Sequence, residues 1–146
     1  MSGLQVENRG IDEDLFNKLI SVFDNILSFK SYRFSLEYLD HGRAGMTMEV
    51  GPEFTNHQSV AHGGLAGALL DTVIGIAAWS LNHNVVTLEM NLNYIGPLKI
   101  GDVVRAEGWV IHAGRINVVA EGEIRNQANK LLAKGRATYY RIGSFI

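Results

Sequence analysis

The longest apolar segment of the chain lies near its middle, and the pattern of apolar positions on either side defines the other elements. Residues 63–80 are apolar on nearly all sides, which predicts an enclosed helix from about Gly63 to Ser80. Between Ile11 and Phe29, apolar residues recur at helical spacing on one face, and three acidic residues begin the segment, as suits a helix dipole. We therefore expect a second, N-terminal helix there.

The remaining apolar segments read as extended. The most regular of them alternates so that Val86, Met90 and Leu92 share one face, while Thr87 falls with polar residues on the other. The simplest packing that encloses the central helix is an antiparallel sheet of about six strands wrapped around it, an α+β arrangement. We expect a single domain over 1–146, with residues 1–30 as an N-terminal helical extension. The predicted strands are Arg33–Asp40, Gly45–Val50, Val85–Tyr94, Val103–His112, Ile116–Arg125 and Leu131–Arg141.

Composition removes several classes of protein from consideration. The 146 residues contain no cysteine, which rules out disulfides, a thiol nucleophile and a thiolate metal site. The net charge of −2 supplies no basic surface for nucleic acid or membrane. No histidine pair has zinc-site spacing with suitable partners, so no metal is expected. With no signal peptide evident and a charge inside the apolar segment, we expect a cytoplasmic protein rather than a membrane protein.

That charge is the most informative residue of the chain. Asp71 is the only charged residue between Leu65 and Trp79. A carboxylate in apolar surroundings costs several kcal/mol unless it is paired, hydrated or used. We therefore predict a functional role for Asp71.

Groups that complement a carboxylate lie just before it. Gly63 and Gly64 place backbone amides at the start of the central helix, where partial positive charge favours a developing oxyanion. Asn56, on the preceding loop, can offer a side-chain amide. Together with Asp71 as base or nucleophile, these groups match the needs of acyl transfer.

Spacing adds a prediction about assembly. Asp71 lies eight residues beyond Gly63, which is about 12 Å along a helix. A carbonyl bound by the Gly63 amide needs its attacking group within about 3–3.5 Å. One subunit cannot easily supply both groups to one substrate, so we predict an obligate dimer with two shared sites.

The stretch from Asn56 through His62-Gly63-Gly64 to Asp71 resembles the signature of hotdog-fold acyl-CoA thioesterases. The resemblance is closer to the phenylacetate-degradation (PaaI-like) type, which has Asp at the acidic position, than to 4-hydroxybenzoyl-CoA thioesterases, which have Glu. Residues 86–97 also look like the third strand and turn of the family. The resemblance implies the hotdog fold and hydrolysis of an acyl-CoA to a carboxylic acid and coenzyme A.

The resemblance also implies roles for five residues. Asp71 matches the catalytic carboxylate, general base or nucleophile, and Gly63 matches the amide that polarises the thioester carbonyl. Asn56 matches a residue that orients carbonyl or water, and His62 one that shapes the loop and approaches the thioester. Thr87 matches a Ser/Thr position that helps to hold the attacking water.

One departure and one set of weaker candidates complete the expected site. Gly75 has no hydroxyl where 4-hydroxybenzoyl-type enzymes place Thr, which favours a site built from Asp71 and Thr87. No cofactor is expected, because coenzyme A is part of the substrate. The family also implies a homodimer with shared sites, assembling to a tetramer. Candidate cations for the coenzyme A phosphates are Arg115, Lys99 and Arg125.

Two other functions remain open at this point. A non-catalytic hotdog module that binds acyl-CoA would be expected to lack the acid on the helix. A hotdog dehydratase or hydratase would carry motifs such as H-F-P or D-x-N-P-x-H, and neither string occurs here. Trp79 and Met90 are expected in the core, with a place in an acyl pocket as the alternative.

Overall fold

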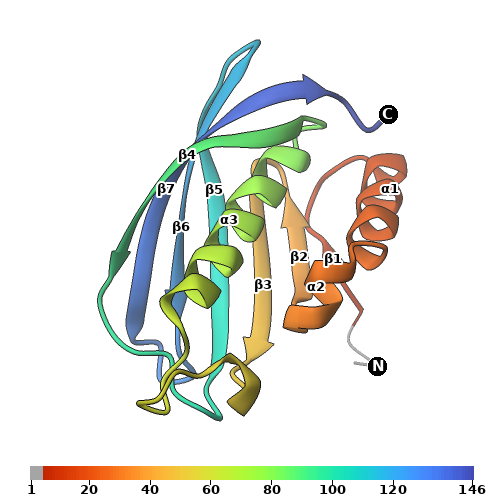
Figure 1. Cartoon of the computed structure of the whole chain (residues 1–146). Coiled ribbons are helices and arrows are strands. Elements are labelled where there is room, and N and C mark those ends of the chain that lie inside the picture. Colours follow the sequence, from red (N-terminus) through yellow and green to blue (C-terminus); the bar gives the residue numbers. More distant parts are fainter. Residues whose placement is uncertain (1–4) are drawn as a thin grey trace.

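A curved seven-stranded sheet wraps around one central helix in the computed structural model, which describes residues 5–146 (Figure 1). The strand order is β1-β2-β3-β5-β6-β7-β4, and every neighbouring pair is antiparallel except β1 and β2. The central helix is α3 (Gly63–Trp79). The strands are β1 (Glu7–Asn8), β2 (Ser35–Asp40), β3 (Arg43–Glu49), β4 (Asn84–Tyr94), β5 (Val103–Ala113), β6 (Asn117–Arg125) and β7 (Leu131–Gly143).

The predicted elements agree with this arrangement in type and order. The central helix ends one residue before the predicted Ser80, and each of the six predicted strands is present with ends shifted by up to two residues. The two-residue β1 is the additional strand. The first hairpin turn is tighter than predicted, because β3 already begins at Arg43.

The single helix predicted over Ile11–Phe29 is wrong: two helices, α1 (Glu13–Asp24) and α2 (Leu27–Tyr32), lie there. The Asn25 side chain donates to the Ser21 carbonyl at 2.7 Å, and Ile26 is extended, so the chain changes direction between them. The acidic start behaves as predicted, since Asp12 caps α1 by accepting from the Leu15 amide at 3.0 Å. Residues 1–4 of the expected extension lie outside the described residues.

Glycines in the middle of two strands allow α3 to lie very close to the sheet. A Cβ on Gly108 of β5 would come within 2.6 Å of the Val73 carbonyl oxygen in α3. A Cβ on Gly122, its register partner in β6, would lie 2.6 Å from the Ile74 side chain. The helix backbone therefore rests directly on β5 and β6, which fixes the height of Asp71 above the sheet.

The enclosed helix predicted from the sequence is buried on most, but not all, of its surface. Ten of its 17 residues are buried, and eight of these belong to the core cluster that also includes residues of α1 and the inner face of the sheet. An incompletely buried stripe runs along the remaining side of the helix and consists of Gly63, Gly64, Gly67, Ala68, Asp71, Thr72 and Trp79.

Among residues 5–146, no helix combines the length and apolar character needed for a membrane crossing.

Strand β4 lies at one edge of the sheet, and its alternation differs from the prediction. The pairing of β4 with β7 shifts between Thr87 and Glu89, as a bulge does. The alternation along the sequence predicted Thr87 on the strand face opposite to that of Met90. Because the bulge reverses the alternation, Thr87 instead faces α3, and Leu88 is 57% exposed.

Candidate active site

The Asp71 carboxylate is held by two hydroxyl groups from neighbouring strands. Thr87 in β4 donates to Asp71 Oδ1 at 2.8 Å, and Tyr139 in β7 donates to the same oxygen at 3.0 Å. Within residues 5–146, no donor bonds to Oδ2. Asp71 is half-buried, so the carboxylate is oriented by the protein on one oxygen and open on the other.

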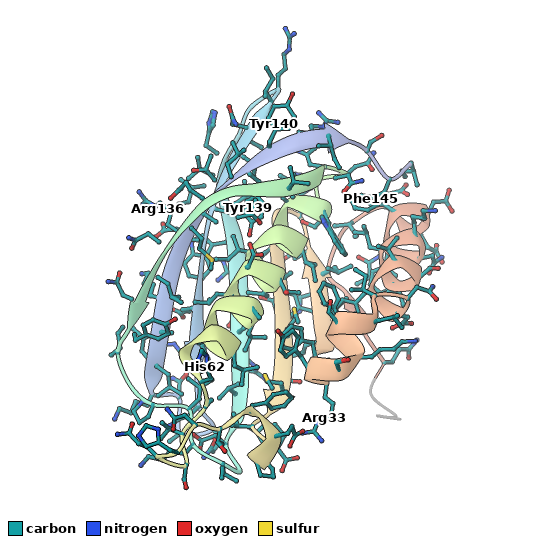
Figure 2. The ribbon with its side chains drawn as sticks, in the orientation of Figure 1. Arg33, His62, Arg136, Tyr139, Tyr140 and Phe145 are labelled. Atoms are coloured by element: carbon teal, nitrogen blue, oxygen red, sulfur yellow. The ribbon has the colours of Figure 1, made fainter. Side chains whose placement is uncertain are left out.

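Tyr139 is the site residue that sequence reasoning missed. Its side chain is 2% exposed, and its single hydroxyl proton is shared between Asp71 Oδ1 and the Asp71 backbone carbonyl, 2.8 Å away. Burial, followed by the negative charge of Asp71, raises the pKa of the Tyr139 hydroxyl well above its ordinary value. The hydroxyl therefore stays protonated and donates at any neutral or mildly alkaline pH. Figure 2 shows Tyr139 farther along α3 than His62, which marks the start of the helix.

The start of α3 leaves one backbone amide free. His62 is the N-cap, and its Nδ1 accepts from the Gly64 amide at 2.9 Å. The Leu65 amide bonds to the His62 carbonyl at 2.9 Å. In the part of the chain that the structure describes, the Gly63 amide forms no hydrogen bond, and the residue is exposed. Gly63 is therefore the unsatisfied donor at the positive end of the helix.

His62 thus has a positioning role in this structure. Since its Nδ1 accepts a hydrogen bond, the neutral imidazole carries its proton on Nε2. The His62 side chain accepts from the amide of Gly64, the second residue of the helix. The amide of Gly63, the first residue, is left available to a ligand. The predicted approach of His62 to a thioester stays a prediction.

Asn56 lies in the loop that leads into α3. Its Oδ1 accepts from the Gln58 amide at 2.9 Å, so the Nδ2 group is the part left to donate to a ligand. A bridge between Thr55 and Ala61 closes the loop, and the His62 amide bonds to the Phe54 carbonyl at 2.8 Å. Asn56 is therefore anchored at the Gly63 end of the helix.

The three candidate cations lie in different places. Lys99 pairs with Val60 through an isolated bridge, at the Gly63 end of α3. Arg125 is bound to Glu123 at 3.0 Å and to the Asn129 carbonyl at 3.0 Å. Arg115 is exposed in the β5–β6 turn, which lies at the other end of the sheet. Of the three, Lys99 is tied by this bridge to the loop that leads into Gly63.

Two cavities adjoin the two candidate groups. The first, of about 330 Å³, lies beside Gly63 and is bounded by His62 and the segment from Tyr94 to Leu98. The second, of about 160 Å³, lies beside Asp71 and Thr87. Trp79, predicted in the core or in an acyl pocket, lines this second cavity, whereas Met90 packs against the core. The site therefore has a separate space at each group.

Comparison with known proteins places these features in a family. The sequence pattern of the thioesterase superfamily matches residues 58–133. A putative esterase of Saccharolobus solfataricus is 31% identical over 130 residues, covering 88% of each chain. The acyl-coenzyme A thioesterase PaaI of Escherichia coli is 29% identical over 126 residues, covering 86% of this chain and 90% of PaaI.

Comparison with solved structures points to the same family. The E. coli PaaI structure superposes with a TM-score of 0.87 at 27% identity, covering 92% of this chain and 98% of that one. A hypothetical thioesterase from Streptococcus pneumoniae, solved with coenzyme A, has a TM-score of 0.74 at 30% identity, covering 76% and 90%. The chain therefore belongs to the thioesterase superfamily and has the hotdog fold. Within that superfamily it is of the PaaI-like type.

Proposed function

We propose that this chain is an acyl-CoA thioesterase that uses Asp71 and the Gly63 amide at one shared site. The observation that carries the proposal is the state of these two groups. Asp71 is oriented through Oδ1 and open at Oδ2, while the Gly63 amide is an exposed donor without a partner in residues 5–146. The similarity to PaaI and to the coenzyme A complex of the pneumococcal protein supports acyl-CoA as the substrate.

The Gly63 amide would bind the thioester carbonyl oxygen. As negative charge develops on that oxygen, the helix dipole and the amide stabilise it. The Asn56 Nδ2 group, anchored at the same end of the helix, is the candidate second donor. Water adds to the carbonyl carbon, the C–S bond breaks, and the thiolate of coenzyme A leaves and takes up a proton.

Thr87 and Asp71 would hold the attacking water. The Thr87 hydroxyl directs its proton to Asp71 Oδ1, so its oxygen can accept a hydrogen bond from water. Asp71 Oδ2 accepts the second water proton as general base. In S. pneumoniae, alanine variants of an aspartate and a threonine 16 positions apart have been solved, the separation of Asp71 and Thr87 here.

Direct attack by Asp71 on the carbonyl carbon is the other route, through an anhydride. A single turnover in heavy-oxygen water distinguishes the two. General-base catalysis places the label in the released acid, whereas the anhydride route first places it in the Asp71 carboxylate. The proposed reaction uses these protein groups and water, and coenzyme A enters only as part of the substrate.

The two groups would meet across a homodimer. Strand β4 is an open sheet edge of 11 residues, with Val86 46% and Leu88 57% exposed. Long apolar edges of this kind are usually covered by another strand. The incompletely buried stripe of α3 lies on the same side, because Thr87 of β4 contacts Asp71.

Symmetry explains how one two-fold axis would complete both sites. In two antiparallel helices related by a two-fold axis, residues equally spaced about the axis face each other. Gly67 is midway between Gly63 and Asp71 along α3. An axis near Gly67 therefore places Gly63 of the partner subunit opposite Asp71, and the reverse. Gly67 and Ala68 are small enough to permit a close approach.

Mixed dimers test the shared site. A Gly63→Pro chain lacks the amide, an Asp71→Asn chain lacks the carboxylate, and each is expected to be inactive alone. Co-expressed with different tags and purified through both, the mixed dimer should regain roughly half of the wild-type activity, because one of its two sites is intact. Activity no higher than that of the parent variants, or an active monomer in sedimentation, would contradict the shared site.

Several finer predictions belong to the same proposal. Lys99, at the Gly63 end, is the first candidate for a coenzyme A phosphate, ahead of Arg115 and the already paired Arg125. Tetramer assembly and a cytoplasmic location stay predictions. Release of free thiol from an acyl-CoA separates the thioesterase from a non-catalytic binding module, and loss of enoyl absorbance would reveal a hydratase.

A further inference from the structure

We propose that Phe29, from the N-terminal helix α2, limits the size of the acyl group that this enzyme accepts. The inference rests on the proposed thioesterase function and concerns the cavity of about 160 Å³ beside Asp71. Neither the helical extension nor Phe29 had a role in the expected site. The structure brings Phe29 to the same cavity as the Asp71 carboxylate, although 42 positions separate them in the sequence.

The cavity is a suitable place for an acyl group because one side is reactive and the other is apolar. Asp71, Thr72 and Thr87 form the polar side, where the attacked carbonyl carbon would lie. The remaining lining residues offer mainly apolar surface. A thioester whose carbonyl meets Asp71 would therefore place its acyl carbons against Phe29, Gly75, Trp79, Val85 and Tyr139.

The size of the cavity sets the expected substrate class. An apolar cavity of about 150 Å³ holds a benzene-sized molecule. This cavity is therefore matched to a compact acyl group, a single ring or a chain of about six carbon atoms. A longer chain that stays within this open-sided pocket would have to displace one of the aromatic walls.

Both aromatic walls are supported from behind. The Phe29 ring lies 5.1 Å from the Phe23 ring and 5.9 Å from the Phe34 ring, and both of those side chains are buried. On the other side, the Trp79 ring meets Phe145 edge-on at 5.3 Å. Figure 2 shows Phe145 in the C-terminal tail, and its contact with Trp79 places it at the end of α3. Packed walls of this kind resist displacement, so they can discriminate by length.

A variant series at Phe29 tests the proposal. Phe29→Ala enlarges the cavity, Phe29→Leu enlarges it less, and Phe29→Trp reduces it. The matched control is Phe16→Ala, which removes another half-buried phenylalanine from the N-terminal helices, packed on the core and away from the cavity. The measurement is kcat/KM for thiol release from acetyl-, butyryl-, hexanoyl-, benzoyl-, decanoyl- and palmitoyl-CoA.

In the wild type, kcat/KM should rise by up to a factor of about four per methylene group, that is about 0.8 kcal/mol each, up to hexanoyl-CoA and then fall. Phe29→Ala should raise the decanoyl-to-hexanoyl ratio by about tenfold or more. Phe29→Trp should lower the hexanoyl-to-acetyl ratio, and Phe16→Ala should leave both ratios unchanged.

The outcomes distinguish failure of the proposed thioesterase function from failure of the proposed role of Phe29. If wild-type protein releases thiol from none of the esters, the proposed function itself fails. If it is active but hydrolyses palmitoyl-CoA as well as hexanoyl-CoA, or if Phe29→Ala lowers every rate equally, the function stands and Phe29 has no part in specificity. If Phe29→Ala does not fold, the test rests on Phe29→Leu and Phe29→Trp, which should shift the kcat/KM ratios between long and short substrates in opposite directions.

Discussion

The two ends of the proposed site are built in different ways, although both belong to one helix. At the start of α3 the reactive group is a backbone amide, exposed by the helix geometry itself and left free because His62 caps the next amide. Eight residues later the reactive group is a carboxylate, whose orientation depends on hydroxyl groups from two strands. The first end needs only local structure, whereas the second needs the whole sheet.

Under the proposed function, this difference explains why a single chain would make both halves of the site but no complete site. Each group is fully positioned by its own subunit and has a free atom, the Gly63 N–H or Asp71 Oδ2. One continuous helix holds them about 12 Å apart. Rigid elements on both sides leave no room for the two groups to approach each other, so completion from a second subunit is the simplest solution.

The largest expected effect comes from the carboxylate. In Asp71→Asn, the amide oxygen can still accept from Thr87 and Tyr139, so the fold and the dimer should persist. The amide cannot take a proton, so kcat should fall by about 10²–10⁴-fold or more. Steady-state thiol release measures the loss, with Asp24→Asn, at the exposed end of α1, as the matched control. Retained hydrolysis in a clean preparation would remove Asp71 from the mechanism.

The amide end should be somewhat less sensitive. Gly63→Pro removes the N–H while keeping the helix backbone, because proline suits the first position of a helix and the extended His62 tolerates a following proline. We expect kcat to fall by about 10²–10³-fold.

Gly63→Ala is the control for this substitution. Its Cβ meets the Tyr94 hydroxyl at 3.2 Å, as that of proline would, but the amide is kept. If the alanine variant loses as much activity as the proline variant, the effect is steric and the amide does not bind the carbonyl oxygen.

The same contrast explains what could be predicted from the sequence. The helix start and the lone acid are local signals, so the central helix could be predicted from a short stretch of residues. The proposed roles of Gly63 and Asp71 rest on the same stretch. The break at Asn25 between α1 and α2 was not predicted, because the apolar spacing continues across it. Sequence patterns reveal the periodicity of apolar residues, but they do not reveal a single residue in an extended conformation.

Features that depend on the sheet were harder to predict. Simple alternation placed Thr87 on the wrong face, because one extra residue in a bulge reverses every later position. Tyr139 is 68 positions from Asp71, so no spacing rule connects them. A signal was available, since alternation in β7 points Ala137 and Tyr139 to the same buried face. A tyrosine hydroxyl directed into a core needs a partner, and Asp71 is the only charge on the central helix.

Tyr139 should give the smallest of these effects and the most specific one. The substitution Tyr139→Phe fills the same space but removes one of the two donors to Oδ1, and we expect kcat to fall about tenfold with little change in KM. The raised pKa of the Tyr139 hydroxyl keeps it protonated below and around the ordinary tyrosine value. Its ionisation, and the stability lost with it, would therefore appear only at more alkaline pH.

The wild type and Tyr139→Phe should consequently share the same alkaline limb of kcat/KM up to about pH 10. Thr138→Val, one residue away and bonded to Glu89 rather than Asp71, is the control that should leave kcat unchanged. An unchanged kcat in Tyr139→Phe would reduce Tyr139 to a packing residue, and the carboxylate would then depend on Thr87 alone.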